Sequence, residues 1–262
     1  MFNRPARKRF GQHFLEDSAV ISAIIQDLML KNTDTVVEIG PGRGALTLPL
    51  LRHLNQLIAI ELDKDVVAAW RAQIHPNLIL IESDALQVDY TQWGKDIRLV
   101  GNLPYNISTP LLIHLLDALP VIQDMHFMLQ KEVVDRLAAN PGTKDYGRLT
   151  VMIQACCEVE WLFDVPPEAF NPPPKVQSAV VRLVPLANPI NAEERVILSR
   201  LLLQAFGMRR KTIANNLKQV MPLDTLTDLG IELTLRPEVL TVAQYIQLAR
   251  SYPPNNPPYH GE

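Results

Sequence analysis

Short apolar runs rich in β-branched residues alternate with helical patterns between about residues 17 and 130. The runs expected to form strands are residues 35–39, 57–60, 78–81, 98–101 and 126–129. Between them, apolar residues recur three or four positions apart at residues 45–51, 66–73 and 110–116, as on the buried face of a helix. Another helical pattern follows the capping pair Asp17-Ser18. The pattern predicts an α/β fold, a doubly wound sheet of mainly parallel strands with helices on both faces.

The second half of the chain changes character near residue 188. A helical pattern at residues 146–157 is followed by two strand-like runs, 159–165 and 178–184, which flank the proline-rich loop at residues 170–175. Beyond it only helical patterns occur, at residues 193–206, 211–220 and 242–250. We therefore expect an α/β domain over residues 1–187, a small all-helical domain over 188–252 and a disordered tail over 253–262, where four prolines and two asparagines occur.

The composition bears on membrane contact, cellular location and metal binding. The chain has 262 residues and is 47% hydrophobic, enough to bury a substantial core, yet no apolar stretch approaches the ~20 residues of a membrane-spanning helix. No apolar region of a secretory signal follows the N-terminus, so we expect a cytoplasmic protein without membrane contact. The only cysteines, Cys156 and Cys157, are adjacent and have no metal-ligand spacing, so no metal site is expected.

A glycine-rich turn, Gly40–Gly44, directly follows the first strand and precedes a helix. Such a turn lets a ligand approach the backbone, but it also opens nicotinamide dinucleotide sites and can be purely structural. Glu61 ends the second strand, 21 residues after Gly40 (61 − 40), where a carboxylate can accept hydrogen bonds from both hydroxyls of a ribose.

Two further acids help to distinguish a methyl donor from a nicotinamide dinucleotide as the ligand of this turn. Asp84 ends the third strand, where it could accept a hydrogen bond from the amine of a cofactor adenine or simply cap a helix. Glu38 immediately precedes the glycine turn, and a carboxylate there suits a sulfonium cation rather than a diphosphate. Acids at three successive strand ends favour a methyl donor, S-adenosylmethionine, over a hydride carrier.

The sharpest feature is Asn102-Leu103-Pro104-Tyr105 at the end of the fourth strand. The exocyclic nitrogen of adenine is a poor nucleophile, so an enzyme that methylates it must hold the amine with its lone pair aimed at the donor. The Asn102 side-chain oxygen and the Leu103 carbonyl can accept its two N–H bonds, and Pro104 would stiffen the turn. Tyr105 offers a face on which a flipped base can stack, worth about 1–3 kcal/mol. Transfer would be a direct displacement that depends on positioning and electrostatics.

These segments together resemble the KsgA-type ribosomal RNA adenine dimethyltransferases over nearly the whole chain. The segments that carry the resemblance are Lys8–Leu15, Glu38–Gly44, Gly101–Pro110, His126–Glu132, Tyr146–Leu149, Phe170–Val181 and Arg209–Thr212. The resemblance implies a Rossmann-like class I S-adenosylmethionine-dependent methyltransferase fold. It also implies dimethylation of two adjacent adenines in the 3′-terminal hairpin loop of 16S ribosomal RNA, during biogenesis of the small ribosomal subunit.

The resemblance also implies residue roles. The expected cofactor-binding residues are His13, Leu15, Gly40, Gly42, Glu61, Asp84 and Asn102. The expected catalytic and target-pocket residues are Asn102, Leu103, Pro104, Tyr105 and Phe170, the last being a second aromatic that would sandwich the base against Tyr105. Two positions depart from the family: His13 stands where Asn is usual, and Ser83 stands where Gly is common.

The expected partner is 16S ribosomal RNA within the small subunit or its precursor, bound by a monomer. A net charge of −3 and a pI near 6.1 argue against a uniformly basic surface, so RNA contacts must be local. The candidate RNA-binding residues are Arg7 and Lys8 near the start and Arg209, Arg210 and Lys211 in the helical domain.

Three other functions share part of this pattern. A DNA adenine methyltransferase or a large-subunit RNA methylase would use the same pocket, and only the helical domain separates them. A binding protein, such as an assembly or transcription factor, could keep the fold without the chemistry, although the intact Asn102, Glu61 and Asp84 speak against this. A dinucleotide oxidoreductase would have no use for residues 102–105.

Overall fold

The computed structural model describes residues 13–208 and 210–252, which fall into two compact units. Unit 1 comprises residues 1–134 and 159–185, and unit 2 comprises residues 135–158 and 186–262. The sequence analysis assigned residues 135–158 to the α/β domain, whereas in the structure they cluster with the C-terminal helices. The segment expected to be a disordered tail, residues 253–262, lies outside the described residues.

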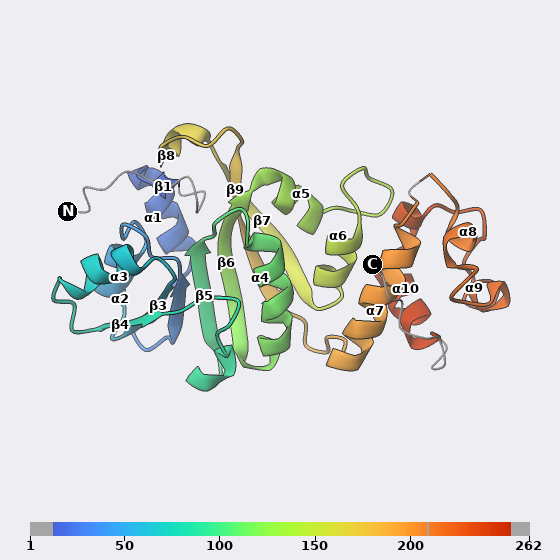
Figure 1. The fold of residues 1–262 in the computed structure, drawn as a ribbon, viewed down its shortest axis with the longest axis horizontal. Helices are drawn as coiled ribbons and strands as arrows, with labels where there is room; N and C mark the ends of the chain where they lie inside the picture. Colours follow the sequence, from blue (N-terminus) through green and yellow to red (C-terminus); the bar gives the residue numbers. More distant parts are fainter. Residues whose placement is uncertain (1–12, 209, 253–262) are drawn as a thin grey trace. The chain divides into compact units, whose positions relative to one another are not determined.

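Unit 1 is built on a seven-stranded sheet with the order β4-β3-β2-β5-β6-β9-β7 (Figure 1). The strands are β2 (Val36–Ile39), β3 (Leu57–Glu61), β4 (Leu78–Glu82), β5 (Ile97–Asn102), β6 (Ile122–Gln130), β7 (Cys157–Val165) and β9 (Ser178–Pro185). The pairs from β4 through β6 are parallel, and β9 is antiparallel to β6. From β2 the chain winds outward through β3 and β4, then returns to β5 on the other side of β2. The order therefore reverses between β2 and β5, where ligands bind in doubly wound sheets.

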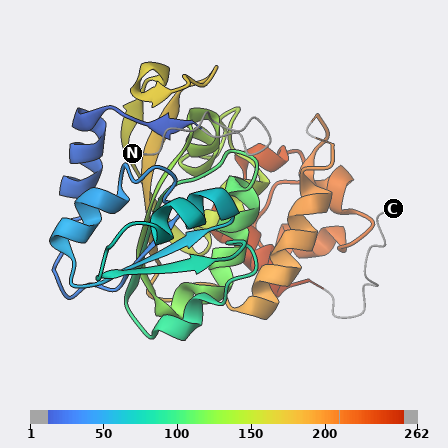
Figure 2. The same ribbon diagram turned by 60° about the vertical axis from the view of Figure 1, so that its left-hand side comes forward.

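Helices cover both faces of this sheet. The helices that begin in unit 1 are α1 (Ser18–Asp27), α2 (Thr47–His53), α3 (Lys64–Arg71), α4 (Ser108–Leu115) and α5 (Lys131–Leu137), with short 3-10 turns at Tyr90–Trp93, Leu116–Val121 and Pro167–Ala169. Buried leucines and isoleucines of α1 and α2, such as Ile24 and Leu50, join strand residues such as Val36 and Val100 in one core cluster. Figure 2 shows α1 and α2 on one side of the sheet and α4 on the other.

A second, two-stranded sheet pairs β1 (Phe14–Leu15) with β8 (Phe170–Asn171). The antiparallel register sets Phe14 opposite Asn171 and Leu15 opposite Phe170. Because side chains alternate along a strand, this register turns Leu15 and Phe170 together into the core, where they are 4% and 3% exposed.

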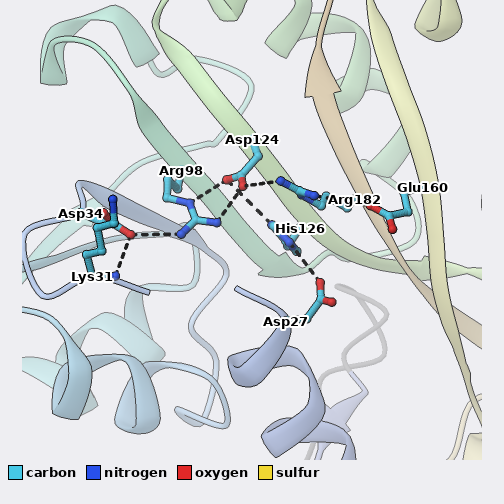
Figure 3. Close-up of polar contacts among 8 residues, drawn as sticks. All are labelled: Asp27, Lys31, Asp34, Arg98, Asp124, His126, Glu160 and Arg182. Atoms are coloured by element: carbon cyan, nitrogen blue, oxygen red, sulfur yellow. Dashed lines mark hydrogen bonds and ion pairs between the residues drawn. The ribbon is translucent and has the colours of Figure 1, made fainter. Parts of the chain in front are cut away.

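A buried ionic network joins the starting ends of β5 and β6 to neighbouring segments of unit 1 (Figure 3). The guanidinium of Arg98 donates two hydrogen bonds to Asp124, at 2.8 and 2.7 Å, and one to Asp34 at 3.0 Å. The Arg182 guanidinium lies 3.6 Å from the second Asp124 oxygen. Burial lowers the pKa of the neighbouring His126 although Asp124 and Asp27 oppose this, so its ring is neutral near pH 7.

Unit 2 is mainly helical in its described residues. Its helices are α6 (Arg148–Gln154), α7 (Ala192–Ala205), α8 (Ile213–Leu217), α9 (Leu223–Asp228) and α10 (Val242–Arg250), with a 3-10 turn at Pro237–Val239. The aromatic rings of Tyr146, Phe206 and Tyr245 form its centre, with neighbouring centroids 6.5 and 5.7 Å apart. Capping boxes begin α7 and α10.

Candidate active site at the ends of the parallel strands

The ends of β2, β3, β4 and β5 line one cavity at the point where the strand order reverses. Its lining residues are His13, Phe14, Ile39, Gly40, Gly42, Ile60, Glu61, Leu62, Asp63, Ser83, Asp84, Ala85, Asn102, Leu103, Pro104, Tyr105, Asn106 and Ile107. The cavity thus brings together His13, Gly40, Gly42, Glu61, Asp84 and residues 102–105, all of which the sequence analysis singled out.

The glycine turn forms one wall of the cavity without filling it. Gly40 has φ +72°, a conformation that side chains with a Cβ rarely adopt. A Cβ at Gly40 would lie 4.0 Å from the Asn102 carbonyl oxygen, on the side of the neighbouring strand end. The backbone of the turn is held from outside by Trp70, whose indole Nε1–H donates to the Gly42 carbonyl at 3.0 Å. The turn therefore leaves space for a ligand beside its backbone, while the hydrogen bond from Trp70 fixes its position.

Glu61 ends β3 with its carboxylate held by three backbone N–H groups. Oε1 accepts from Leu62 and Asp63, both at 2.9 Å, and Oε2 accepts from Gly42 at 3.3 Å. Burial raises the pKa of Glu61, and these hydrogen bonds oppose the rise. Since each carboxylate oxygen has two lone pairs, the group keeps acceptor capacity for a ligand in the cavity.

Asp84 lies beyond the end of β4 and is oriented by its own turn. Its Oδ1 accepts from the Leu86 N–H at 3.0 Å, which leaves Oδ2 without a hydrogen-bond partner among the residues that the structure describes. A carboxylate oxygen beside the cavity can accept from an amine, as the sequence analysis expected. The hydroxyl of Ser83, where glycine is usual in the family, is directed to the Asp84 carbonyl at 3.4 Å.

Asn102 ends β5 with a defined side-chain orientation. Its Nδ2 donates to the His13 carbonyl at 3.1 Å, so Oδ1 is the atom that remains to accept a hydrogen bond. The next residue, Leu103, is 1% exposed, and its N–H donates to the Met128 carbonyl at 3.1 Å. The Pro104 carbonyl accepts from the Ile107 N–H at 3.1 Å, directly before α4. The turn after β5 is therefore tied to β6 and to the next helix.

Tyr105 lies beside Asn102 and is held at both ends. Its hydroxyl shares a hydrogen bond of 2.9 Å with Ser178 Oγ, and its carbonyl accepts from the Ser108 hydroxyl at 3.1 Å. The His13 ring is stacked on the Tyr105 ring, with centroids 5.8 Å apart and an interplanar angle of 29°. Burial raises the pKa of Tyr105, so the hydroxyl stays neutral.

Glu38, at the end of β2, lies in a second cavity that shares Gly40, Gly42 and Asn102 with the first. It is 2% exposed, and Oε2 has no hydrogen-bond partner among the described residues. Burial raises the pKa of Glu38 to about 8, with hydrogen bonding from Thr47 opposing the shift and Glu61 adding to it. The carboxyl is therefore protonated near pH 7, whereas the sequence analysis took it for a carboxylate that attracts a cation.

Not every expected site residue lines the first cavity. Leu15 lines the second cavity together with its chain neighbours Phe14 and Glu16, and most of its surface is buried in the core. Phe170 lines neither cavity: it pairs with Leu15, and both side chains are buried in the same core cluster. Arg210 and Lys211 are exposed in unit 2. Arg7, Lys8 and Arg209 lie outside the described residues.

Two contributors were not expected from the sequence. Ser178 is fully buried at the start of β9 and fixes the Tyr105 hydroxyl, whereas the sequence marked it only as the start of a strand-like run within the segment Phe170–Val181. Phe14 lines both cavities and carries the Arg43 guanidinium 4.0 Å above its ring. Both roles depend on pairings between distant segments, which no local pattern records.

Among the residues that the structure describes, no group of three or more His, Cys, Asp or Glu side chains is arranged to hold a metal ion. Within the same ranges, 13–208 and 210–252, no helix combines the length and apolarity needed to cross a bilayer.

Two solved structures with a similar fold are RNA or adenosine methyltransferases by name. A dimethyladenosine transferase from Plasmodium falciparum is 27% identical, with a TM-score of 0.76 over 90% of this chain and 96% of the other. The 23S rRNA methyltransferase ErmE is 26% identical, with a TM-score of 0.70 over 91% of this chain and 99% of the other. The fold and the cavity at its strand ends define a class I methyltransferase.

The family within that class follows from the sequence. The model of the family described as "Ribosomal RNA adenine dimethylase" matches residues 3–253, and the chain belongs to this family of enzymes. A protein of Legionella pneumophila named "Ribosomal RNA small subunit methyltransferase A" is 55% identical over 93% of this chain and 96% of its own length. A protein of the same name from Dechloromonas aromatica is 52% identical, with the same coverage.

Proposed function

We propose that the protein dimethylates N6 of two adjacent adenines in the 3′-terminal hairpin loop of 16S ribosomal RNA, within the small subunit or its precursor. The observation that carries this proposal is the orientation of Asn102. Its Nδ2 is engaged by the His13 carbonyl at 3.1 Å, so Oδ1 is the acceptor available to an amine in the cavity that Asn102 lines. The two relatives named above, which are small-subunit methyltransferases by name, support the choice of RNA.

The residues around the cavity fit S-adenosylmethionine. When bound, this cofactor supplies an activated methyl group. Glu61 would accept a hydrogen bond from a ribose hydroxyl at Oε2, because that oxygen has one backbone partner whereas Oε1 already has two. The Asp84 oxygen Oδ2 would accept from the amine of the cofactor's adenine. Gly40 and Gly42 leave room for the cofactor beside the backbone. Leu15 on β1 and His13, directly before β1, would complete the site.

The target base would be held by residues 102–105. The Asn102 Oδ1 and the Leu103 carbonyl would accept the two N–H bonds of the base amine, which aims the nitrogen lone pair away from both acceptors. The tied turn holds these oxygens before the base arrives, so little reorganisation is needed during transfer. Tyr105 would stack on the base. No side chain has to act as a nucleophile.

Glu38 would respond to the charge of the cofactor. With a pKa of about 8 it is mostly protonated near pH 7, and a nearby cation favours the ionised form of a carboxyl. Glu38 lines a cavity that shares Gly40 and Asn102 with the proposed cofactor site. We therefore assign Glu38 to the electrostatic environment of the methyl donor.

The RNA partner would be bound mainly through local basic groups. Arg210 and Lys211 are exposed in unit 2, and Arg7, Lys8 and Arg209 complete the set from outside the described residues. The protein would act as a cytoplasmic monomer in small-subunit biogenesis.

The test is transfer of labelled methyl groups to small subunits that lack the modification. The RNA is digested and the labelled nucleoside identified; dimethyladenosine in 16S RNA is the expected product. Label in large-subunit RNA instead would redirect the assignment to the activity named for the structural relative ErmE. Absence of label in every RNA would contradict the proposal.

Asn102→Ala is the matching variant. Removal of the acceptor should lower transfer by at least a hundredfold, the scale seen when one preorganised polar contact to the reacting group is lost. The control is Asn55→Ala, because Asn55 is exposed and lines neither cavity. This variant should retain full activity. Circular dichroism and cofactor binding of both variants separate lost chemistry from lost folding.

A further inference from the structure

The His13 ring is stacked on a face of Tyr105, the ring on which the proposed target base would stack, and both residues line the first cavity. The two rings are 5.8 Å apart at 29°, within the range of offset stacking between aromatic side chains. The imidazole Nδ1 donates to the Pro172 carbonyl at 2.7 Å, since that carbonyl can only accept. His13 therefore has two specific side-chain contacts in the free protein, one to the turn after β5 and one to the proline-rich loop.

Of the two rings, Tyr105 is the fixed one. Its hydroxyl is bonded to the fully buried Ser178, and its backbone carbonyl is bonded to Ser108 at the start of α4. His13 is half-buried and lies directly before the two-residue strand β1. Any rearrangement that opens the Tyr105 face must therefore move the His13 side chain.

The backbone of His13 has a separate task. Its carbonyl accepts from Asn102 Nδ2 at 3.1 Å and so orients the amide whose oxygen would bind the base. A rotation of the His13 side chain about its own bonds leaves that carbonyl in place. The ring can thus leave Tyr105 without disturbing Asn102.

We infer that the His13 ring is a stand-in for the target base: it occupies the Tyr105 face in the free enzyme and is displaced when the base enters. This inference rests on the proposed function, because it requires a flipped base at Tyr105. It makes His13 a specificity residue, since only a base that stacks on Tyr105 better than an imidazole can take its place. A purine has a larger π-face than either an imidazole or a pyrimidine.

The test follows base entry with 2-aminopurine next to the two target adenines, which keep their N6 amines, in an RNA that carries the small-subunit 3′ hairpin. Titration with the protein saturated with S-adenosylhomocysteine prevents turnover, and the fluorescence change reports the base leaving its stack. His13→Ala should tighten apparent RNA affinity by about three- to tenfold, the range that corresponds to one lost aromatic contact. His13→Asn, which has no ring but keeps a polar side chain, should behave alike.

Three controls make the outcome decisive. Affinity for S-adenosylhomocysteine is measured separately by calorimetry, because His13 also lines the proposed cofactor site, and RNA is titrated only where each His13 variant is saturated with it. In a Tyr105→Ala background, His13→Ala should have no further effect, because the covered face is gone. Unfolding of the variants is checked by circular dichroism.

The failures are distinguishable. If the fluorescence changes with the wild type but His13→Ala binds equally well or more weakly, the stand-in role is overturned and base flipping stands. If His13→Ala leaves base entry unchanged at saturating S-adenosylhomocysteine and weakens only cofactor binding, His13 acts at the cofactor alone and the inference is overturned. If no protein variant alters the fluorescence, base flipping at this cavity is itself rejected, and the inference with it.

Discussion

Gly101 precedes the proposed acceptor Asn102 on β5, which pairs with β2. A Cβ at this position would lie 2.6 Å from the Ile39 carbonyl oxygen, which is backbone and cannot move aside. Gly101→Ala should therefore push the two strands apart where the sheet order reverses. We expect a loss of about 1–3 kcal/mol in the free energy of unfolding, the usual cost of overpacking, together with weaker cofactor binding.

Urea unfolding with the control Gly147→Ala checks this expectation. An added Cβ at Gly147 meets no atom within 4 Å, and its φ of −169° is open to any residue. That variant should unfold within about 0.5 kcal/mol of the wild type. Equal stability of the Gly101 and Gly147 variants would show that the strands adjust without cost.

Glu38 gives the protein a specific pH dependence. Its pKa is raised from 4.5 to about 8 in the folded state, chiefly by burial, so between these values the folded protein binds one more proton than the unfolded chain. The stability contributed by the protonated carboxyl is full below pH 4.5 and is lost as the pH rises toward 8, by up to about 1.4 kcal/mol per pH unit.

Glu38→Gln mimics the protonated carboxyl and should remove this slope. In cofactor-free protein, the free energy of unfolding of wild type minus that of Glu38→Gln is expected to fall steadily between pH 5.5 and 8. Urea denaturation at four pH values in that window measures it. A difference that stays constant with pH would mean that Glu38 is ionised throughout.

At the scale of elements, the ionic network fixes the starting ends of the strands whose other ends form the site. Arg98 and Asn102 are four residues apart on β5, about 13 Å at 3.3 Å per residue. Arg98→Met would leave the Asp124 carboxylate, 1% exposed, with only the Arg182 contact at 3.6 Å and the neutral His126. We expect a loss of about 3–5 kcal/mol in unfolding free energy, the cost of breaking a buried ion pair.

The matched control is Arg71→Met, which breaks the exposed pair between Arg71 and Glu82. Those side chains are 59% and 33% exposed, and such pairs contribute about 0–1 kcal/mol. Thermal or urea unfolding compares the two variants directly. If Arg98→Met costs no more than Arg71→Met, the network does not hold the strand ends.

The elements that could be predicted are those with a strong local pattern. Strands β2, β3 and β5 are buried over most of their length and are mainly apolar, with Glu38 in β2 and Arg98 in β5 as buried exceptions; the doubly wound fold class predicted from such runs is confirmed. The ends of helices were harder to predict than their presence. Helix α3 begins at Lys64, two residues before the apolar pattern at residues 66–73, because the Asp63 side chain caps it.

The elements that were missed depend on distant partners. β1 and β8 have two residues each and exist only because they pair with one another, 155 residues apart by the register of Leu15 and Phe170 (170 − 15). The same limit applies to the site. Acids and amides at strand ends were predictable from their positions, whereas the inward turn of Phe170 and the stacking of His13 on Tyr105 follow from that unforeseen pairing.

At the scale of the whole molecule, the distribution of charge indicates that RNA is bound by residues away from the proposed cofactor site. The net charge of −3 gives no general attraction for RNA, and the proposed cofactor site is itself lined by the acids Glu61, Asp63 and Asp84. Attraction for a polyanion must therefore come from groups elsewhere. Lysine and arginine side chains that neutralise phosphates release counterions, so each contact contributes to the salt dependence of binding.

Arg210 and Lys211 are the described candidates for such contacts, and a double alanine variant tests them. Loss of two phosphate contacts should weaken binding to small subunits and reduce the slope of log K against log salt by about 0.7–0.9 per contact. Binding measured at four salt concentrations gives the slope, and calorimetry with S-adenosylhomocysteine should show unchanged affinity. The control replaces Lys95 and Arg71, exposed cations of unit 1, with the same change in net charge. If both double variants lower affinity equally, net charge alone acts; if neither alters the slope, Arg210 and Lys211 do not touch phosphate and the RNA must be held by other residues.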